Sequence, residues 1–306
     1  TNYDLLFSLA KTKMESDEID FDLKIQEIVT SELSCRDLQS SIFFAPDEIR
    51  ACCKRFFYKG KMKGDVVLLD NESNVTLQNI NYAKKELITK INRDEAPECR
   101  GCPYIERKKK IKSKVNYISL ENFNYCNMKC SYCSPKYYGG KESKYDLENI
   151  IDSLTEDQLD ENLHIVWGGG EPTLSRNFKP VSHKLLSQKN VNKFRVLTNS
   201  LRYSKNLELL LENNSTEIVT SVDAGTQETF QKVRGRGKID DVLSNLLTYS
   251  KVNINRRYIT IKYIINSENS AVNELIQFVE LIRNYKLTNV YFQISLDFNI
   301  EKPNPS

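Results

Sequence analysis

The stretch Asn122–Pro135 reads NFNYCNMKCSYCSP and directly follows an apolar, strand-like run. It places Cys126, Cys130 and Cys133 in a C-x3-C-x2-C array. Three thiolates this close on one loop suit iron or an iron–sulfur cluster better than three unrelated core positions; a structural zinc knuckle and three chance cysteines are the alternatives. Because three ligands leave one iron of a four-iron cube without a protein ligand, the array predicts a [4Fe–4S] cluster with one open corner for chemistry.

Outward from this loop, the chain from Val115 onward alternates apolar strands with amphipathic helices. The predicted strands are Val115–Leu120, His164–Trp167, Lys193–Leu197, Glu217–Val222, Tyr258–Ile265 and Val290–Ser295. The predicted helices are Asp146–Leu154, Lys179–Gln188, Asn206–Glu212, Thr226–Lys232, Asp240–Tyr249 and Ala271–Tyr285. This alternation predicts an α/β fold with a parallel sheet, whose ligands lie at the C-terminal ends of the strands.

Two of the predicted strands end in motifs of small or polar residues. Trp167–Pro172 reads WGGGEP at the end of the second strand, and Leu197–Ser200 reads LTNS at the end of the third. Glycines let the backbone approach a ligand closely, and Asn199 offers a polar side chain at the same edge of the sheet. A glycine-rich turn and a strand-ending Asn turn without a ligand are the alternatives.

Tyr132 precedes the last cysteine of the loop, so the array also reads C-x3-C-x-aromatic-C. With this array and WGGGEP, the sequence strongly resembles the radical SAM superfamily, over residues 115–297 in pattern. The resemblance implies a partial (β/α)6 TIM-like barrel over residues 115–306. A small cysteine-rich α+β domain with a helical segment, residues 1–114, would precede it. The resemblance also implies that the three-cysteine cluster binds and reductively cleaves S-adenosylmethionine.

The resemblance further implies which residues hold S-adenosylmethionine. Thr220–Gly225, TSVDAG, resembles the S-x-D-G stretch of peptide-modifying members, with Ala224 where glycine is usual. Ser221 and Asp223 alternate along the strand, so they point to one side, where they would bond the ribose or the carboxylate. Arg234 matches an arginine that binds the methionine carboxylate of S-adenosylmethionine in relatives, and its planar guanidinium suits that contact. A surface arginine without a ligand is the alternative. The implied contacts are Tyr132, Gly169, Gly170, Glu171, Asn199, Ser221, Asp223 and Arg234. Gln293, a polar residue within the apolar sixth strand, is a further candidate for cofactor or substrate contact, and a structural role is the alternative.

Five further cysteines precede the barrel: Cys35, the adjacent pair Cys52 and Cys53, and Cys99 and Cys102 in ECRGCPYI. Neighbouring side chains rarely point at the same ion, so only one of Cys52 and Cys53 is expected to be a ligand. Four metal ligands are then available. A second, fully ligated [4Fe–4S] cluster is the first interpretation; it resembles auxiliary clusters of the SPASM or twitch type, although those usually lie C-terminal to the barrel. A structural zinc site and buried free thiols are the alternatives.

The remaining N-terminal segments carry no visible chemistry. Residues 1–34 show apolar positions at helical spacing and predict one or two amphipathic helices. Ser41–Phe57 and Asp65–Asp70 predict short strands around an Ala45–Asp47 turn. The basic run Glu106–Lys114 predicts a solvated linker, and an electrostatic landing site for an acidic partner is the alternative.

The composition indicates the redox environment of the protein and the classes of partner it can have. Eight cysteines without a leader peptide or a twenty-residue apolar run predict a reducing cytoplasm and metal-bound thiolates rather than disulfides. A net charge of +3 gives no bias toward nucleic acid or a membrane. A reductant such as flavodoxin or ferredoxin is the protein partner that the chemistry requires.

We therefore expect a radical SAM enzyme, an oxidoreductase, epimerase or other radical-based modifying enzyme. Its 5′-deoxyadenosyl radical would remove hydrogen from an unactivated carbon of a peptide or protein. The same chemistry on a sugar or nucleotide-sugar is the alternative. A hypothesis of another class is a non-catalytic iron–sulfur protein for electron transfer or scaffolding, which predicts the loss of at least one cofactor motif.

Overall fold

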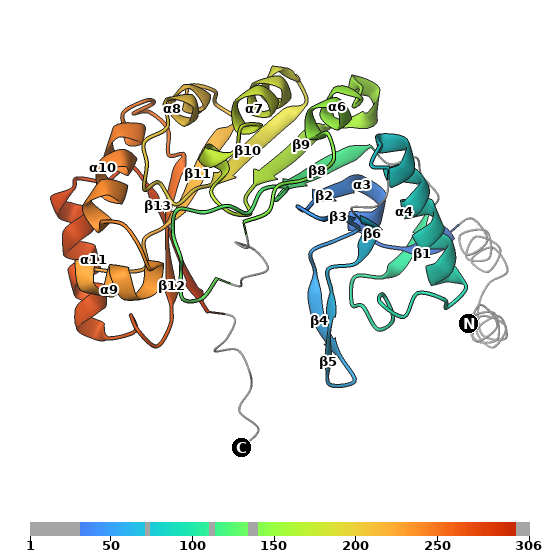
Figure 1. The fold of residues 1–306 in the computed structure, drawn as a ribbon, viewed down its shortest axis with the longest axis horizontal. Helices are drawn as coiled ribbons and strands as arrows, with labels where there is room; N and C mark the ends of the chain where they lie inside the picture. Colours follow the sequence, from blue (N-terminus) through green and yellow to red (C-terminus); the bar gives the residue numbers. More distant parts are fainter. Residues whose placement is uncertain (1–30, 71–73, 110–113, 134–139, 298–306) are drawn as a thin grey trace, which may run out of the picture.

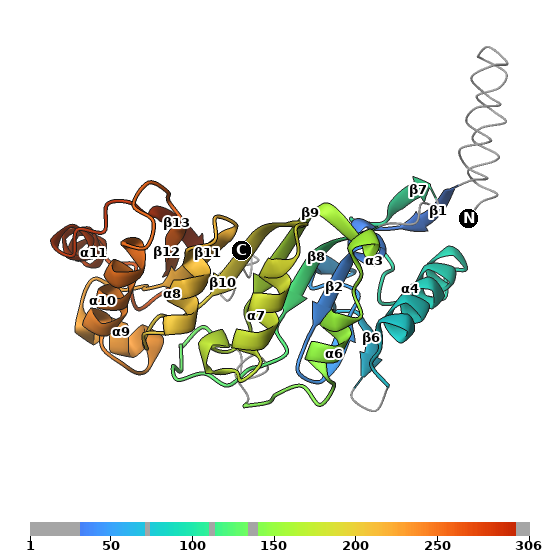
Figure 2. The ribbon, with the colours of Figure 1, turned by 90° about the horizontal axis from the view of Figure 1, so that it is seen from above.

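The computed structural model describes residues 31–70, 74–109, 114–133 and 140–297. A long curved sheet runs through the molecule, with helices on its outer side (Figure 1). The N-terminal elements lie at one end of this sheet, and α11 and β13 lie at the other (Figure 2). The sheet therefore sets the positions of every site described below.

Six strands of the sheet pair in parallel and follow one another in chain order. They are β8 (Val115–Leu120), β9 (Leu159–Trp167), β10 (Val191–Leu197), β11 (Thr216–Ser221), β12 (Ile259–Ile265) and β13 (Tyr291–Leu296). The predicted parallel α/β sheet is confirmed. The second strand begins five residues earlier than predicted, because the polar stretch Leu159–Leu163 extends β9 along its neighbour β8.

Helices cover the outer face of these six strands (Figure 1). They are α6 (Leu147–Asp152), α7 (Phe178–Ser187), α8 (Lys205–Leu211), α9 (Gln227–Arg234), α10 (Ile239–Ser250) and α11 (Val272–Asn284), with short 3-10 turns η1 (Glu156–Gln158) and η2 (Pro172–Leu174). Each predicted helix exists within two residues of its predicted ends. In the described part of the chain, no helix is both long enough and apolar enough to span a bilayer.

Alternation along the strands separates the core from the inner face. On β12, Ile259, Ile261 and Tyr263 are buried under the helices, whereas Thr260 and Lys262, which alternate with them, are only partly buried. The same alternation occurs on β11, where Ile218 is buried and Val219 is not. Because successive side chains point to opposite faces, the partly buried set lies on the concave inner face.

The N-terminal region extends the same sheet. β2 (Ser41–Phe44) pairs in parallel with β8, and β3 (Glu48–Arg50) and β6 (Val67–Asp70) follow antiparallel, which gives nine strands in the described sheet. The short strands predicted around the Ala45–Asp47 turn are confirmed. The division of the chain at residue 114 stays a prediction, and hydrogen bonds of one continuous sheet cross it.

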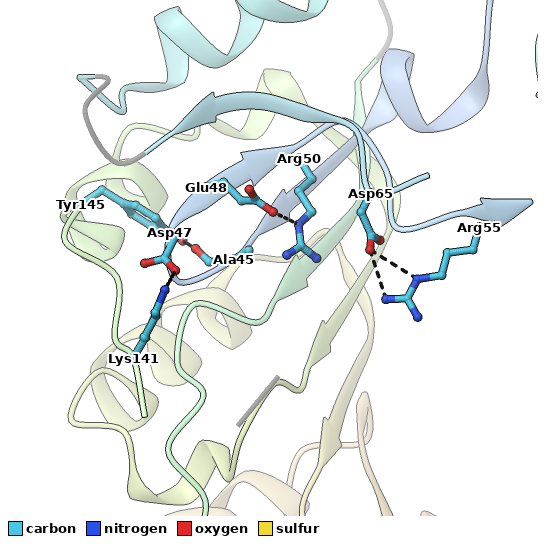
Figure 3. Close-up of polar contacts among 8 residues, drawn as sticks. All are labelled: Ala45, Asp47, Glu48, Arg50, Arg55, Asp65, Lys141 and Tyr145. Atoms are coloured by element: carbon cyan, nitrogen blue, oxygen red, sulfur yellow. Dashed lines mark hydrogen bonds and ion pairs between the residues drawn. The ribbon is translucent and has the colours of Figure 1, made fainter. Parts of the chain in front are cut away.

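Side chains also join the two regions. The Tyr145 hydroxyl donates to the Ala45 carbonyl over 2.7 Å, and Lys141 forms an ion pair with Asp47 (Figure 3). Both contacts link the turn between β2 and β3 to the segment that follows the cysteine loop. The cysteine loop is therefore attached to the N-terminal region as well as to its own strand.

The other N-terminal elements are short except for the 16-residue helix α4. They are β1 (Ser31–Ser34), α3 (Arg36–Ser40), β4 (Arg55–Tyr58), β5 (Lys61–Gly64), α4 (Leu77–Asn92) and β7 (Glu106–Lys109). β1 pairs antiparallel with β7, so the predictions of helix for 31–34 and of linker for 106–109 are wrong. The pairing sets Glu32 opposite Lys108, and the Asn92 side chain bonds both backbone groups of Leu33 over 2.9 Å. The predicted helices within residues 1–30 lie outside the described residues.

Candidate active site

The cysteine loop rests on the glycine motif at the end of β9. The Gly170 N–H donates to the Phe123 carbonyl over 2.9 Å, and the Glu171 N–H donates to the Tyr125 carbonyl over 2.8 Å. A Cβ on Gly170 would lie 2.1 Å from the Tyr125 oxygen. Only glycine fits this contact, so the two predicted motifs are parts of one structure.

The other side of the loop rests on the C-terminal end of α9. The Lys129 N–H donates to the Arg234 carbonyl over 3.1 Å, and the Ser131 N–H donates to the Val233 carbonyl over 2.8 Å. Gly235 ends the helix at φ +75°, and a Cβ there would lie 2.2 Å from the Lys129 oxygen. Two rigid elements thus hold the loop by its backbone.

The three thiols of the loop are neighbours. Burial raises the pKa of each, to about 12 for Cys133, and Cys126 and Cys130 add to the rise at Cys133 by charge repulsion. Cys126 Sγ accepts from the Met128 N–H at 3.4 Å and from Asn199 Nδ2 at 3.5 Å. Three thiolates in this setting call for a positively charged partner, which an iron–sulfur cluster supplies.

No three His, Cys, Asp or Glu side chains among the described residues converge on a position for a single ion. A [4Fe–4S] cluster does not require such convergence, because each of its irons takes a different thiolate. The donor set of the loop therefore fits a cluster better than the alternative of a zinc knuckle.

A cavity of about 370 Å³ opens beside the loop, over the C-terminal ends of the parallel strands. Its wall brings together most of the predicted site residues: Cys126, Cys130, Tyr132, Cys133, Gly169, Gly170, Asn199, Ser221, Arg234 and Gln293. Ser221 and Gln293 come from β11 and β13, and each is paired in register with Lys262 on β12. The cavity is large enough for a small cofactor and part of a substrate.

Asp223 lies behind the wall rather than on it. Its carboxylate accepts from the Tyr132 hydroxyl at 2.7 Å, from Arg234 Nη1 at 3.1 Å and from the Ile264 N–H at 2.7 Å. Its side chain is fully buried, and its backbone has φ +62°, a conformation braced by Asn269, which donates to its carbonyl over 2.8 Å. Asp223 thus orients Tyr132 and Arg234, and its contact with a cofactor stays a prediction.

Arg234 is the charged group that Asp223 positions. Although burial opposes its charge, the neighbouring Tyr132, Cys130 and Asp223 raise the pKa of Arg234, so it stays a cation. Its side chain is 6% exposed, and its Nε has no hydrogen-bond partner. Asn127 Nδ2, near Cys126, is a second buried donor without an acceptor. Unsatisfied buried donors beside the thiols fit a ligand with carboxylate or hydroxyl oxygens, as S-adenosylmethionine has.

Glu171 is also bonded within the chain, and its contact with a cofactor stays a prediction. The carboxylate accepts from the Thr198 hydroxyl at 2.9 Å, the Thr173 hydroxyl at 2.7 Å and the Asn199 N–H at 2.6 Å. It is 2% exposed, and burial raises its pKa. These bonds tie the end of β9 to the end of β10, so the described geometry gives Glu171 a supporting place behind the cavity.

Sequence reasoning missed several residues of the wall. Arg195 and Leu197 on β10, Val219 on β11 and Lys262 on β12 line the cavity. Arg195 pairs with Glu217 on the neighbouring strand. The signal was the two-residue alternation of the strands, which puts these positions on the face opposite the buried apolar residues.

The N-terminal cysteines separate into two groups. Cys35, Cys52, Cys99 and Cys102 line one small cavity of about 20 Å³, whereas Cys53 is exposed and outside it. Four of the five predicted candidates are thus brought together. The identity of any metal there stays a prediction.

Comparison with known proteins supports the reading of the first site. The family model described as "Radical SAM superfamily" matches residues 121–292, which is more than half of the chain. The GTP 3′,8-cyclase of Actinobacillus pleuropneumoniae serotype 3 is 26% identical over 150 residues, 45% of this chain and 43% of that protein. The GTP 3′,8-cyclase of Vibrio parahaemolyticus is 27% identical over 158 residues, 48% of this chain and 46% of that protein. The matches span less than half the length of these relatives.

Among solved structures, Streptococcus suis SuiB bound to S-adenosylmethionine covers 74% of this chain and 48% of its own, at 14% identity and a TM-score of 0.48. The structure described as anSMEcpe with bound AdoMet covers 61% of this chain and 52% of its own, at 17% identity and a TM-score of 0.47. The family match, the three-cysteine loop and the cavity beside it agree. The chain belongs to the radical SAM superfamily, whose members use a [4Fe–4S] cluster and S-adenosylmethionine.

Proposed function

We propose that this protein is a radical enzyme that removes a hydrogen atom from an unactivated carbon of an organic substrate. The observation that supports it most is that the three-cysteine loop and the cation Arg234, with its unpaired Nε, share one 370 Å³ cavity. When bound there, the cluster and S-adenosylmethionine supply a 5′-deoxyadenosyl radical. The open face of the cavity leaves room for a substrate next to it.

The residues of the chain would divide the work as follows. Cys126, Cys130 and Cys133 hold the cluster and leave one iron free of protein ligands. Arg234 binds the carboxylate of S-adenosylmethionine, and Asp223 and Tyr132 fix the direction of its guanidinium. The hydrogen bonds with Asp223 and Tyr132 restrict the Arg234 side chain before the cofactor binds. Binding therefore costs less conformational entropy of that side chain.

The substrate is the finer part of the proposal. A peptide or protein is the first candidate, because the Thr220–Gly225 stretch resembles that of peptide-modifying members. A nucleotide or nucleotide-sugar is the second, because the cationic side chains Arg195 and Lys262 line the same cavity. GTP, the substrate in the name of the matched cyclases, carries a fitting anionic group. Both candidates predict a substrate with a carboxylate or phosphate.

The reaction also needs an electron donor, for which we propose flavodoxin or ferredoxin in a reducing cytoplasm. The outcome at the substrate carbon would be oxidation, epimerisation or another radical modification. All of these begin with the same hydrogen transfer. One assay of that transfer therefore tests them together.

The test uses reconstituted protein, a reductant, S-adenosylmethionine and deuterated substrate pools of three kinds: peptides, nucleotide-sugars and nucleotides. We expect deuterium in 5′-deoxyadenosine from one pool. Lys262→Met should raise the KM for that substrate about tenfold, the effect of about 1.4 kcal/mol of lost charge pairing, with little change in uncoupled 5′-deoxyadenosine formation. Lys184→Met on the outer helix α7 is the matched control.

Two results would contradict this proposal. 5′-deoxyadenosine without deuterium from every pool would remove all three substrate classes. No 5′-deoxyadenosine from protein with a full cluster would revive the alternative of a non-catalytic iron–sulfur protein for electron transfer or scaffolding.

A further inference from the structure

The second cysteine cluster, Cys35, Cys52, Cys99 and Cys102, is assembled from three separate segments. Cys35 caps the N-terminus of α3, Cys52 follows β3, and the other two lie in the turn between α4 and β7. That turn is stabilised by the Cys102 N–H, which donates to the Cys99 carbonyl over 3.1 Å. Segments this far apart do not bring four thiols to one cavity by local spacing alone.

Backbone donors point at two of these sulfurs. The Leu38 N–H donates to Cys35 Sγ at 3.5 Å, and the backbone N–H groups of Lys54 and Val66 act to lower the pKa of the Cys52 thiol against the larger effect of burial. N–H donors favour the thiolate over the thiol, and they recur around metal-bound sulfur. A cluster of plain buried thiols has no need of them.

A buried cation lies beside the same thiols. The Lys84 side chain is 6% exposed; it donates to the Ser41 carbonyl, and Cys35 and the carboxyl group of Asp37 lie near its ammonium. Four thiolates with either Zn²⁺ or a [4Fe–4S]²⁺ core carry a net charge of two minus. Since a buried ammonium is costly without a counter-charge, such a centre explains why a lysine stays in this part of the core. Asp37 supplies one further negative charge, and Lys54 at the rim of the cavity supplies a positive one.

Cys53 is not part of the set. It is exposed, and it does not line the cavity. Adjacent residues on an extended chain point in opposite directions, so Cys52 and Cys53 cannot both face one centre. The structure thereby separates the pair that the sequence left ambiguous.

We propose that Cys35, Cys52, Cys99 and Cys102 bind a thiolate-ligated metal centre, and that Cys53 is not a ligand. The small volume of the cavity favours a single Zn²⁺, with all four positions closed. The thiols do not converge on one point, which favours a [4Fe–4S] cube. The two share the same ligands and the same net charge. With four protein ligands, either one has no site for substrate, so its role is structural or in electron transfer. This inference does not depend on the proposed function.

The experiment removes the first site and counts metal at the second. In a Cys126→Ser/Cys130→Ser/Cys133→Ser background, reconstituted anaerobically with iron and sulfide or loaded with zinc, we expect about one zinc, or about four irons and four sulfides, per chain. Adding Cys52→Ser should abolish this metal, and adding Cys53→Ser should leave it in place. Loading separate samples with zinc and with iron shows which of the two metals the site binds.

A second measurement does not depend on whether variants fold. In the metal-loaded full chain, alkylation followed by mass spectrometry should label Cys53 quickly and the other four slowly, and a chelator should abolish the difference. A triple-variant background that holds neither metal would overturn the proposal. Equal metal loss in Cys52→Ser and Cys53→Ser, or equal alkylation of all five thiols, would overturn it as well.

Discussion

The two cysteine sites of this protein differ in how many ligands they offer and how much space they leave. The first places three cysteines of one loop beside a cavity of about 370 Å³ at the open face of the sheet. The second places four cysteines of three segments around about 20 Å³. A site with one ligand missing and room beside it can bind a substrate or cofactor at the metal, whereas a closed four-ligand site has no position for one.

The sites also differ in what holds them. The first loop is fixed by backbone hydrogen bonds to β9 and α9 and by two glycines that leave no room for a side chain. The second relies on backbone donors to sulfur and on a buried lysine. The first site thus has its frame built by the chain itself, whereas the second, if it binds metal as proposed, would be completed by that metal.

The largest expected effect distinguishes the two sites directly. Cys130→Ser should lower 5′-deoxyadenosine formation at least about 100-fold, because the cube loses one of only three ligands. Cys53→Ser, a cysteine that lines neither cavity, should retain the wild-type rate. The measurement is 5′-deoxyadenosine by chromatography after anaerobic reduction. Equal rates in the two variants would break the distinction.

The next largest effect is expected at the glycine contact that holds the loop of the first site. Gly235→Ala puts a Cβ 2.2 Å from the Lys129 carbonyl at φ +75°, and Gly60→Ala has φ +74° with nothing within 4 Å. We expect unfolding free energies lower by about 3 kcal/mol and about 1 kcal/mol, since both variants carry the left-handed strain but only the first has a clash. Denaturant unfolding of apo protein, followed by the fluorescence of Trp167, the single tryptophan, measures both. Equal losses would mean that the loop does not depend on this contact.

Cofactor binding should respond more weakly. Arg234→Met should weaken S-adenosylmethionine binding about 10- to 30-fold, or about 1.4–2 kcal/mol, because one charge-assisted contact is lost. Arg236→Met, an exposed arginine two residues on, is the matched control and should bind as the wild type does. Equilibrium dialysis with labelled cofactor gives both constants. Unchanged binding in Arg234→Met would remove Arg234 from the cofactor site.

The smallest effect concerns Glu171, which braces the cavity from behind. Burial raises its pKa, so the folded state keeps the Glu171 proton to a higher pH than the unfolded state does. The stability from this titration is present below the ordinary pKa of a glutamate and is lost as pH rises through the raised value. Glu171→Gln should therefore lower the unfolding free energy by about 1 kcal/mol, more at pH 5.5 than at pH 8. A difference that grows toward pH 8 would contradict the raised pKa.

Local patterns were enough to predict the barrel half of the fold and the two sets of thiols. The alternation of Ile259 and Ile261 with polar neighbours marks β12 as a strand, and the cysteine spacing marks the loop. The pairing of β2 with β8 was missed, because no local pattern records which distant strand a segment joins. β1 was missed because its four residues are a strand only through their partner β7.

Side-chain roles were harder to predict than elements. Asp223 and Glu171 occupy the predicted places, yet their carboxylates turn to Tyr132, Arg234 and Thr198. Those contacts depend on strand ends that meet only in the folded sheet. Arg195 was missed because nothing near it in the sequence marks it, although its strand was predicted.

The central claim is that the three-cysteine site alone carries the radical chemistry. The most direct measurement is 5′-deoxyadenosine formed per chain in wild type, in Cys126→Ser, and in Cys99→Ser/Cys102→Ser, each with its iron content determined. The account predicts 5′-deoxyadenosine from the wild type, none from Cys126→Ser, and a measurable amount from the folded Cys99→Ser/Cys102→Ser variant. Undiminished 5′-deoxyadenosine from Cys126→Ser would contradict it, and so would none from a wild type that carries its full iron.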